Sequence, residues 1–188
     1  MEHLTVIKNS YIGLHDHMIP MMLNTKGPRL RNRTIERINP IVWMAWHILR
    51  CEDMYFNTIM FDLPQVYHRD NWKEKLKIKT NQVGTGMTVE EVNVISRKID
   101  LGALFGYNQE MKSTILALLD QPPIPIDSPL DNEPLLYQRL KDTDSFPEEM
   151  CRNRAKAYAP FDVSSGLVGI ISHAYMHIGQ YNAITKSI

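Results

Sequence analysis

The sequence predicts an all-α fold: a four-helix bundle in which a long proline-rich connection precedes the last helix. Three observations lead to this prediction. Four long segments carry apolar residues at intervals of three and four, the spacing that places them on one face of a helix. No segment shows a convincing alternation of apolar and polar residues, which would mark a strand. Seven of the 11 prolines fall between Gln121 and Pro160, which excludes one long helix there.

The first helix is expected from about Glu2 to Leu23. Residues that would face the core recur there at helical intervals: Leu4, Ile7, Tyr11, Leu14, Met18 and Met21. Pro20 lacks a backbone N–H and its ring crowds the preceding turn, so the helix should kink or end near it. Lys26-Gly27-Pro28 then stops any continuation.

The second helix is expected from about Pro40 to Phe61. Asn39 is a good N-cap, and Pro40 would then occupy the first helical position, where its missing N–H costs nothing. One face of this helix is apolar and also carries a histidine and a cysteine; its members are Trp43, Met44, His47, Cys51 and Met54. The helix becomes polar beyond Leu49, and Pro64 lies just past its end.

A polar, irregular stretch from Leu63 to Met87 follows, with Gly84-Thr85-Gly86 near its end. Thr88 and Glu91 form a capping box that starts a short helix. The third long helix is expected from about Arg97 to Leu119. Asn108 interrupts its apolar stripe, either as a polar residue at the edge of the stripe or as a residue that faces the site.

The proline-rich connection, Gln121 to Pro160, is expected to carry short helices around Leu135–Leu140 and Pro147–Ala157. We interpret it as a crossover that returns the chain to the far end of the bundle and could cover the site. The last helix should begin near Asp162 or Ser164, either of which can cap it, and run almost to the terminus. Residues 1–188 are expected to form a single domain.

Composition excludes several classes of function. Lysine plus arginine and aspartate plus glutamate both number 21, and no long basic run occurs, which argues against nucleic acid as a partner. The basic cluster from Lys26 to Arg37 is interpreted as a solvated loop. Two cysteines are too few for a disulfide framework. Met1–Ser10 lacks signal-peptide features, and the apolar run Pro40–Leu49 is too short to span a membrane, so a cytoplasmic location is expected.

The most informative motif is His173-Ala174-Tyr175-Met176-His177. Histidines four apart on a helix share a face, with Cβ atoms roughly 5–6 Å apart, which suits two imidazoles on one metal ion. His47, in another apolar helical run, could supply a third nitrogen. Three histidine ligands leave coordination positions open, as in catalytic rather than structural metal sites. The alternative is a set of core histidines that are hydrogen-bonded to neighbouring groups.

Other residues were considered for the same site. The motif is not the HExxH of zinc proteases, because Ala174 replaces the glutamate that acts as general base. His15 is a weak catalytic candidate, as a fourth ligand, a proton shuttle or a substrate contact. Cys51, one turn after His47, could ligate a soft metal as a thiolate, but a small buried apolar residue is the more common case. Groups that could orient the ligands are Glu52, Asp53 and Gln180.

Several of these motifs together resemble the DinB/YfiT-like family of metalloenzymes. Trp43–Asp53 resembles the signature of that family's second helix, and His173–Gln180 resembles its last-helix HxxxHxGQ signature. Met87–Val92, followed by Asp100-Leu101, resembles its run into the third helix. The resemblance spans most of the chain, and the proline-rich connection is its least familiar part.

The resemblance implies a four-helix bundle with an unusual chain order and a divalent metal ion, which is zinc, nickel or iron, on three histidines. By position these are His47, His173 and His177. It also implies a homodimer and a thiol-dependent reaction, in which a low-molecular-weight thiol of the bacillithiol or mycothiol kind is transferred to a small-molecule substrate. The mycothiol-dependent isomerases of the family carry a further C-terminal domain, and this chain ends at Ile188, which counts against that reaction.

The sequence therefore predicts a metal-dependent enzyme, with thiol transfer as the first expectation and metal-dependent hydrolysis as the second. A non-catalytic bundle, in which the histidines bind a metal for stability or bind none, is the alternative of another class. The last helix is apolar on its outer side too, at Val168, Ile171 and Tyr175. Such a face is expected to pack against something, so a symmetric homodimer through the last helix, or through the first and last helices, is predicted.

Overall fold

The computed structural model describes the backbone of residues 2–186 and the side chains of residues 4–186. The described chain is helical throughout, and its only extended pairing is an isolated antiparallel bridge between Pro129 and Asp162. The helices are α1 (Glu2–Gly13), α2 (Ile19–Leu23), α3 (Ile41–Asp53), α4 (Val66–Arg69), α5 (Trp72–Lys75), α6 (Val89–Lys98), α7 (Leu101–Asp120), α8 (Glu133–Asp142), α9 (Glu148–Tyr158) and α10 (Val163–Lys186).

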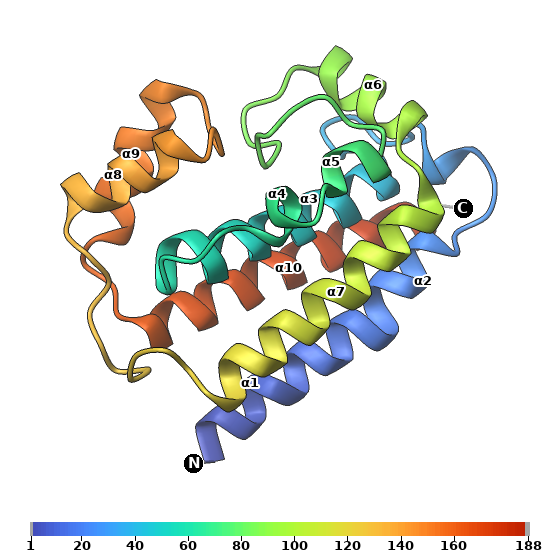
Figure 1. Cartoon of the computed structure of the whole chain (residues 1–188). Helices are drawn as coiled ribbons and strands as arrows, with labels where there is room; N and C mark the ends of the chain where they lie inside the picture. The colour runs from blue at the N-terminus through green and yellow to red at the C-terminus, as the bar shows by residue number, and fades with distance from the viewer. Residues whose placement is uncertain (1, 187–188) are drawn as a thin grey trace.

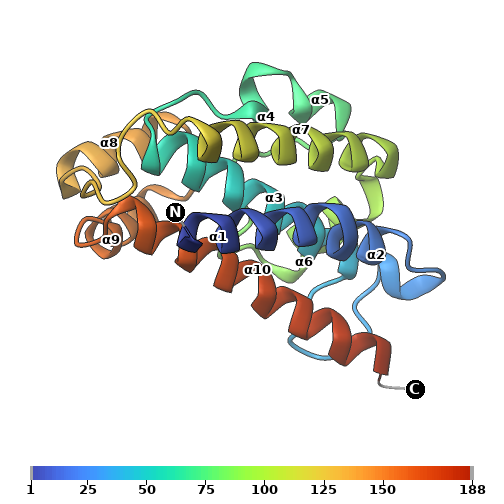
Figure 2. The same ribbon diagram turned by 90° about the horizontal axis from the view of Figure 1, so that it is seen from below.

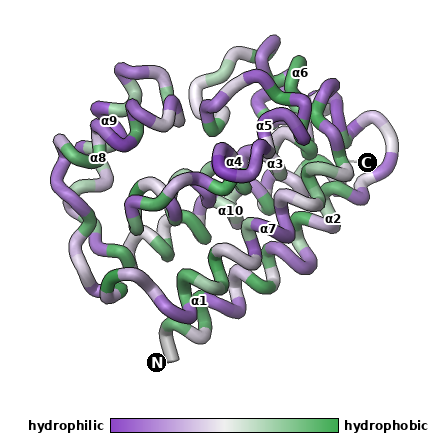
Figure 3. Tube along the Cα trace, in the orientation of Figure 1, coloured by the Kyte–Doolittle hydropathy of each residue, from purple (hydrophilic) through white to green (hydrophobic). Residues whose placement is uncertain are grey.

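Four long helical segments lie side by side: α1 with α2, α3, α7 and α10 (Figures 1 and 2). Helix α3 lies at the centre of this arrangement, in contact with α2, α7 and α10. All 13 residues of α3 are buried, including three charged ones, Arg50, Glu52 and Asp53. Along α1 and α7, hydrophobic and hydrophilic positions alternate, as expected for helices with one face on a core (Figure 3).

The first long segment continues through Pro20 instead of ending there. A π-helical turn, Leu14–Met18, precedes the proline, and the Ile19 N–H bonds to the Leu14 carbonyl, one residue farther back than in an α-helix. Proline has no N–H to give and its ring crowds the carbonyl four residues earlier. A wider turn at this place lets the segment continue, and such π turns are common sites of helix kinks.

Two predicted helix starts differ from the structure, the first by one residue and the second by four. Pro40 itself is the N-cap of α3, and the side chain of Asn39 instead accepts a hydrogen bond of 2.6 Å from Arg33. The third long helix starts at Leu101 and not near Arg97, which belongs to the last turn of α6. The chain breaks before Leu101 because the Asp100 side chain caps α7, accepting from the Ala103 N–H at 3.0 Å.

Other local predictions are confirmed. Thr88 and Glu91 form the reciprocal capping box at the start of α6. The connection between α7 and α10 carries two short helices, α8 and α9, which pack against each other. Helix α8 also packs against the π-helical stretch Met54–Met60, which continues α3 and forms the end of the α3 segment. Asp162 caps α10, accepting from the Ser165 N–H at 2.7 Å.

A buried polar network fixes the segment between α3 and α6. Asp53 accepts the backbone N–H groups of Val66 and Tyr67 at 2.9 and 2.8 Å, so it holds the start of α4. Arg50 donates to the side chain of Gln65 at 3.0 Å and to the carbonyl of Asn81 at 2.7 Å. These bonds satisfy buried charges and set the path of the loop that reaches the candidate site.

Among residues 2–186, no helix combines the length and apolar character that crossing a bilayer requires.

Candidate metal centre

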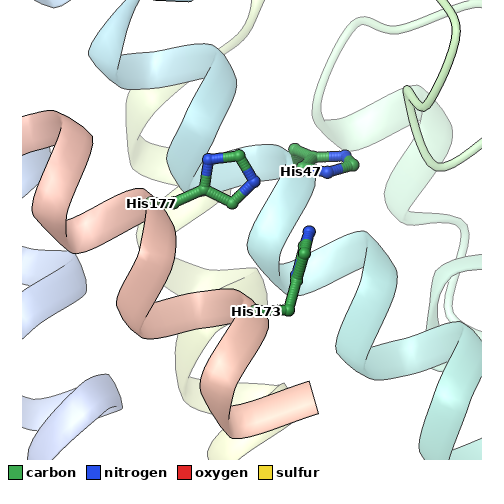
Figure 4. A group of neighbouring side chains, drawn as sticks. All are labelled: His47, His173 and His177. Atoms are coloured by element: carbon green, nitrogen blue, oxygen red, sulfur yellow. The ribbon is translucent and has the colours of Figure 1, made fainter. Parts of the chain in front are cut away.

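Three histidines from two helices meet on one side of α3. His47 lies about two turns into α3, and His173 and His177 lie one turn apart on α10 (Figure 4). One nitrogen from each ring lies within 4.8 Å of the corresponding nitrogens of the other two. The ring centroids are 4.8 to 5.1 Å apart, and the rings stand steeply to one another, at 71° to 90°. The structure therefore brings together the three residues that the sequence predicts.

Hydrogen bonds fix the tautomers of two of these rings. Nδ1 of His47 lies 2.6 Å from the carbonyl oxygen of Val83, which can only accept, so Nδ1 carries the proton. Nδ1 of His177 donates to Oε1 of Gln180 at 2.8 Å. In both rings Nε2 then carries the lone pair, which is the form of imidazole that ligates a metal. Nε2 of His177 has no protein partner among the described residues, and Nε2 of His47 lies 3.7 Å from Sγ of Cys51.

Two nitrogens of the cluster are buried and lack a protein partner among the described residues. They are Nδ1 of His173 and Nε2 of His177. A buried polar atom without a hydrogen bond costs roughly 1–3 kcal/mol. A metal ion among the three rings would satisfy the His177 nitrogen directly, and three imidazoles are a common donor set for zinc, nickel, copper or iron. The residues present thus fit a divalent transition-metal ion.

Electrostatics keep the three rings neutral. Burial, and then the neighbouring His177 and His173, hold the pKa of His47 well below its ordinary value. Burial, followed by repulsion from His177 and Arg154, lowers the pKa of His173 to about 4. Burial also lowers the pKa of His177. At neutral pH the rings carry no proton that a metal ion would have to displace.

A short loop that contains Val83 and Gly84 packs against the outer side of His47. Gly84 has a φ of +102°, and a Cβ there would lie 2.9 Å from ring atoms of both Trp43 and Trp46 and 3.2 Å from Nδ1 of His47. The Trp43 ring stacks on His47 at 4.7 Å between centroids and 15° between planes. Only glycine allows the backbone to approach these rings so closely, and that approach brings the Val83 carbonyl to His47.

The loop is also tied to the helical hairpin of α8 and α9. The backbone N–H of Val83 bonds to the carbonyl of Ser145, in the α8–α9 turn, at 3.0 Å. One residue thus links the hairpin to His47, because its N–H contacts the hairpin and its carbonyl contacts the ring.

Cys51 lies beside the cluster but is not part of the histidine group. Its Sγ is 3.7 Å from both ring nitrogens of His47, and its side chain is buried. Burial raises the pKa of this thiol to about 12, which keeps it protonated. This fits the expectation of a small buried residue.

The weak candidate His15 lies in a different buried cluster. Its Nδ1 is 2.8 Å from Oδ1 of Asn108, and its Nε2 is 3.5 Å from a carboxylate oxygen of Glu52. Asn108 thus faces His15 and not the three histidines. Of the residues considered as orienting groups, Gln180 contacts a ligand histidine, whereas Glu52 faces His15 and Asp53 holds the network at α4.

Three features of the site were missed by the sequence reasoning: the Val83 carbonyl, the close approach of Gly84, and Arg154. Arg154 on α9 lines the pocket over the histidines, together with Arg37 and Gln180. Gly84-Thr85-Gly86 was the only available signal, because paired glycines indicate a tight turn. No sequence pattern predicts which side chains that turn contacts.

No family model matches this chain, and no curated sequence matches it.

Proposed function

We propose that this protein is a divalent-metal-dependent enzyme whose metal ion is held by His47, His173 and His177. The observation that carries the proposal is the convergence of three neutral imidazoles, two buried and one half-buried, each with a ring nitrogen within 4.8 Å of those of the other two. Three protein ligands leave coordination positions for water or substrate, which is typical of catalytic sites.

We further propose that the chain is a four-helix bundle of the DinB/YfiT-like type and that its reaction is transfer of a low-molecular-weight thiol to a small substrate. The support is the pair of histidine signatures in the sequence, together with four long helical segments that lie side by side. A thiol co-substrate of this kind would require a reducing compartment such as the cytoplasm.

The chain's own residues would perform two tasks in such a reaction. Val83 and Gln180 fix the orientation of His47 and His177 by accepting their Nδ1–H groups. Trp43 and the loop at Gly84 shield one side of His47 from water. When bound, a divalent ion would supply a Lewis acid that lowers the pKa of a thiol or a water molecule at its open positions.

The first test is the metal content of protein purified without chelator, measured by mass spectrometry. We expect about one divalent ion per chain, lost in the His173→Ala/His177→Ala double variant. His17→Ala is the matched control, because His17 is exposed and lies outside the cluster. If the native protein takes up no ion even after incubation with zinc, nickel or iron(II), the metal centre is refuted.

The reaction class is tested next, with the metal-loaded protein. Low-molecular-weight thiols are offered with electrophilic substrates, and ester or amide substrates are offered without thiol. Thiol conjugation that disappears in the double variant supports transfer, whereas hydrolysis with the same dependence supports the metal-dependent hydrolase. A protein that binds the metal, melts at lower temperature without it and is inactive in both screens would be a metal-stabilised, non-catalytic bundle.

We also propose that the protein forms a symmetric homodimer through the outer face of α10. Val168 and Tyr175 on this face are exposed by 56% and 39%, whereas Ile171 is half-buried. Val6 of α1 lies beside the same face and is 65% exposed. Apolar side chains that are exposed together are typical of an interaction surface.

A further inference from the structure

Two adjoining pockets open beside the histidine cluster. One, of about 360 Å³, lies over the three histidines, and the other, of about 190 Å³, lies between α9, α10 and the end of the α3 segment. Thr85, Arg154 and His173 line both pockets. A ligand in the second pocket would therefore extend from Arg154 to the metal centre.

The charge of these pockets is one-sided. Among the described residues that line them there are two arginines, Arg37 and Arg154, and no aspartate or glutamate. Over the whole chain, in contrast, acidic and basic residues are equal in number, at 21 each. A pocket lined by one sign of charge raises the local concentration of ligands of the opposite sign, and a metal dication would add to the effect.

Arg154 has no acidic partner to neutralise it. Within residues 4–186, no carboxylate lies within 4.0 Å of its guanidinium; its neighbours include the uncharged side chain of Tyr158 and the Phe146 ring, which lies 5.7 Å from it. Arg139 on the partner helix of the same hairpin is different, since it pairs with Asp62 at 2.8 Å and Asp131 at 2.6 Å. Arg154 is half-buried, and its side chain lines both pockets.

The second pocket is apolar and aromatic away from Arg154. Its wall includes Tyr55 and Tyr158, whose rings meet edge to face at 4.8 Å, together with Phe146 and Ile170. An apolar cavity of roughly 150 Å³ accepts a benzene molecule, so this pocket is large enough for one ring or a short acyl chain.

We propose that the substrate of this site carries a carboxylate or phosphate group that binds Arg154, and an apolar or aromatic body that fills the pocket of Tyr55, Phe146 and Ile170. The inference rests on the proposed function, because it assigns the substrate class of the same metal centre. A guanidinium suits this role because it binds planar anionic groups through two parallel hydrogen bonds. Arg154 is then a specificity residue, whose position on α9 makes the proline-rich connection part of the binding site.

The test measures binding of three probes of similar shape by calorimetry: phenylacetate, phenyl phosphate and 2-phenylethanol. It is carried out on both the metal-loaded and the metal-free protein. We expect at least one anion to bind about tenfold or more tightly than the neutral alcohol, since hydrogen bonds to charged groups are the strong ones. The tighter of the two anions identifies the group as a carboxylate or a phosphate.

Three variants test whether Arg154 is the residue that causes the preference for anions. Arg154→Gln should weaken anion binding about tenfold and leave the affinity for 2-phenylethanol unchanged. Arg154→Lys should retain part of the preference for the anions over the alcohol. Arg152→Gln is the matched control, because Arg152 lies on the same helix, is exposed and lines neither pocket. Unchanged melting temperatures would show that the variants fold.

The outcomes separate this inference from the proposed function. Anion binding that needs the metal but not Arg154 overturns the inference and leaves the metal centre intact. Anion binding that depends on Arg154 in a protein that binds no metal supports the anion site and refutes the metal enzyme. Equal binding of all three probes, or no measurable binding of either anion at millimolar concentration, also overturns the inference.

Discussion

At the scale of single residues, the candidate ligand histidines depend on neighbouring groups that hold their rings in place. Gln180 accepts the Nδ1–H of His177 at 2.8 Å and lies three residues farther along α10. Partners of this kind fix the tautomer and direction of a ligand histidine, and their loss commonly costs about 10–100-fold in metal affinity.

We therefore expect Gln180→Ala to weaken metal binding by about 10–100-fold without abolishing it. The affinity is measured by competition with a chromophoric chelator. Asn182→Ala, at an exposed position two residues away, should leave the affinity unchanged. If Gln180→Ala binds the metal as tightly as the native protein, Gln180 does not orient the ligand.

A second residue-scale prediction concerns Glu52, which lies away from the metal centre. Its side chain is fully buried, and neither carboxyl oxygen has a hydrogen-bond partner among the described residues. Burial raises the pKa of Glu52 well above its ordinary value, whereas burial lowers the pKa of the neighbouring His15 to about 4. At moderately acidic pH both side chains are neutral in the folded protein.

The pH dependence of stability follows from the sign of the Glu52 shift. Its folded pKa is higher than its unfolded pKa, so the unfolded state loses the proton first and stability falls as pH rises above about 4.5. Glu52→Gln removes this titration and keeps the shape. The variant should gain stability relative to the native protein as the pH rises above about 5, by at most about 1.4 kcal/mol per pH unit.

Urea unfolding at several pH values measures this difference. His15 is present in both proteins, so its own titration largely cancels. Exposed Glu36→Gln is the control and should show no such trend. Parallel stability curves for the native protein and Glu52→Gln would show that Glu52 is ionised in the folded state or titrates at its ordinary pKa.

The ligand residues were predictable from the sequence, whereas their surroundings were not. His173 and His177 share a helix face at any register, because their spacing alone decides it. His47 was predictable as a ligand only because it lies on an apolar helix face. The Val83 carbonyl and Arg154 reach the site through the packing of a loop and a short helix, and no local pattern records that packing.

At the scale of elements, the loop at Gly84 sets the orientation of the His47 ring on α3. Gly84→Ala would place a methyl group 2.9 Å from Trp43 and Trp46 and would force an L-residue into a left-handed conformation. We expect a loss of about 1–3 kcal/mol in unfolding free energy. We also expect weaker metal binding, because the Val83 carbonyl would move away from His47.

The control for this prediction separates the backbone strain of a positive φ from the steric clash of the new methyl group with the tryptophan rings. Gly27 also has a positive φ, +79°, but a Cβ there would meet nothing within 4 Å. Gly27→Ala should therefore cost stability through backbone strain alone and leave metal affinity unchanged. Calorimetric melting and chelator competition measure the two effects, and equal metal affinities for Gly84→Ala and Gly27→Ala would contradict the role assigned to the loop.

The elements themselves were largely predictable, because helices with one buried face carry a periodic signal. A helix boundary was predicted wrongly where a polar side chain interrupts an apolar helical periodicity that continues on both sides of it. Asp100 divides α6 from α7 by capping, although the residues around it remain compatible with one helix. Of the two outcomes predicted at Pro20, an end of the first segment does not occur, and a π-helical turn, which is a common site of helix kinks, precedes the proline.

At the scale of the whole molecule, one face of α10 carries the candidate metal ligands, and the opposite face is the proposed dimer surface. Residue 177 lies nine positions after residue 168, and at 100° per residue these positions are on opposite sides of a helix. His177 accordingly faces α3, whereas Val168 is 56% exposed on the outer side. The proposed dimer surface is therefore separate from the metal centre, although one helix carries both.

This separation gives the last prediction. Val168→Asp places a charge in the proposed apolar interface, where it would lose water without gaining a partner, so it should convert a dimer to a monomer. Because the ligands lie on the other side of α10, the variant should keep its metal content. Light scattering at micromolar concentration measures the mass, beside Val94→Asp as a control at an exposed position of α6. A native protein that is monomeric under these conditions would refute the dimer, and a Val168→Asp monomer that also loses its metal would show that the two faces of α10 are coupled.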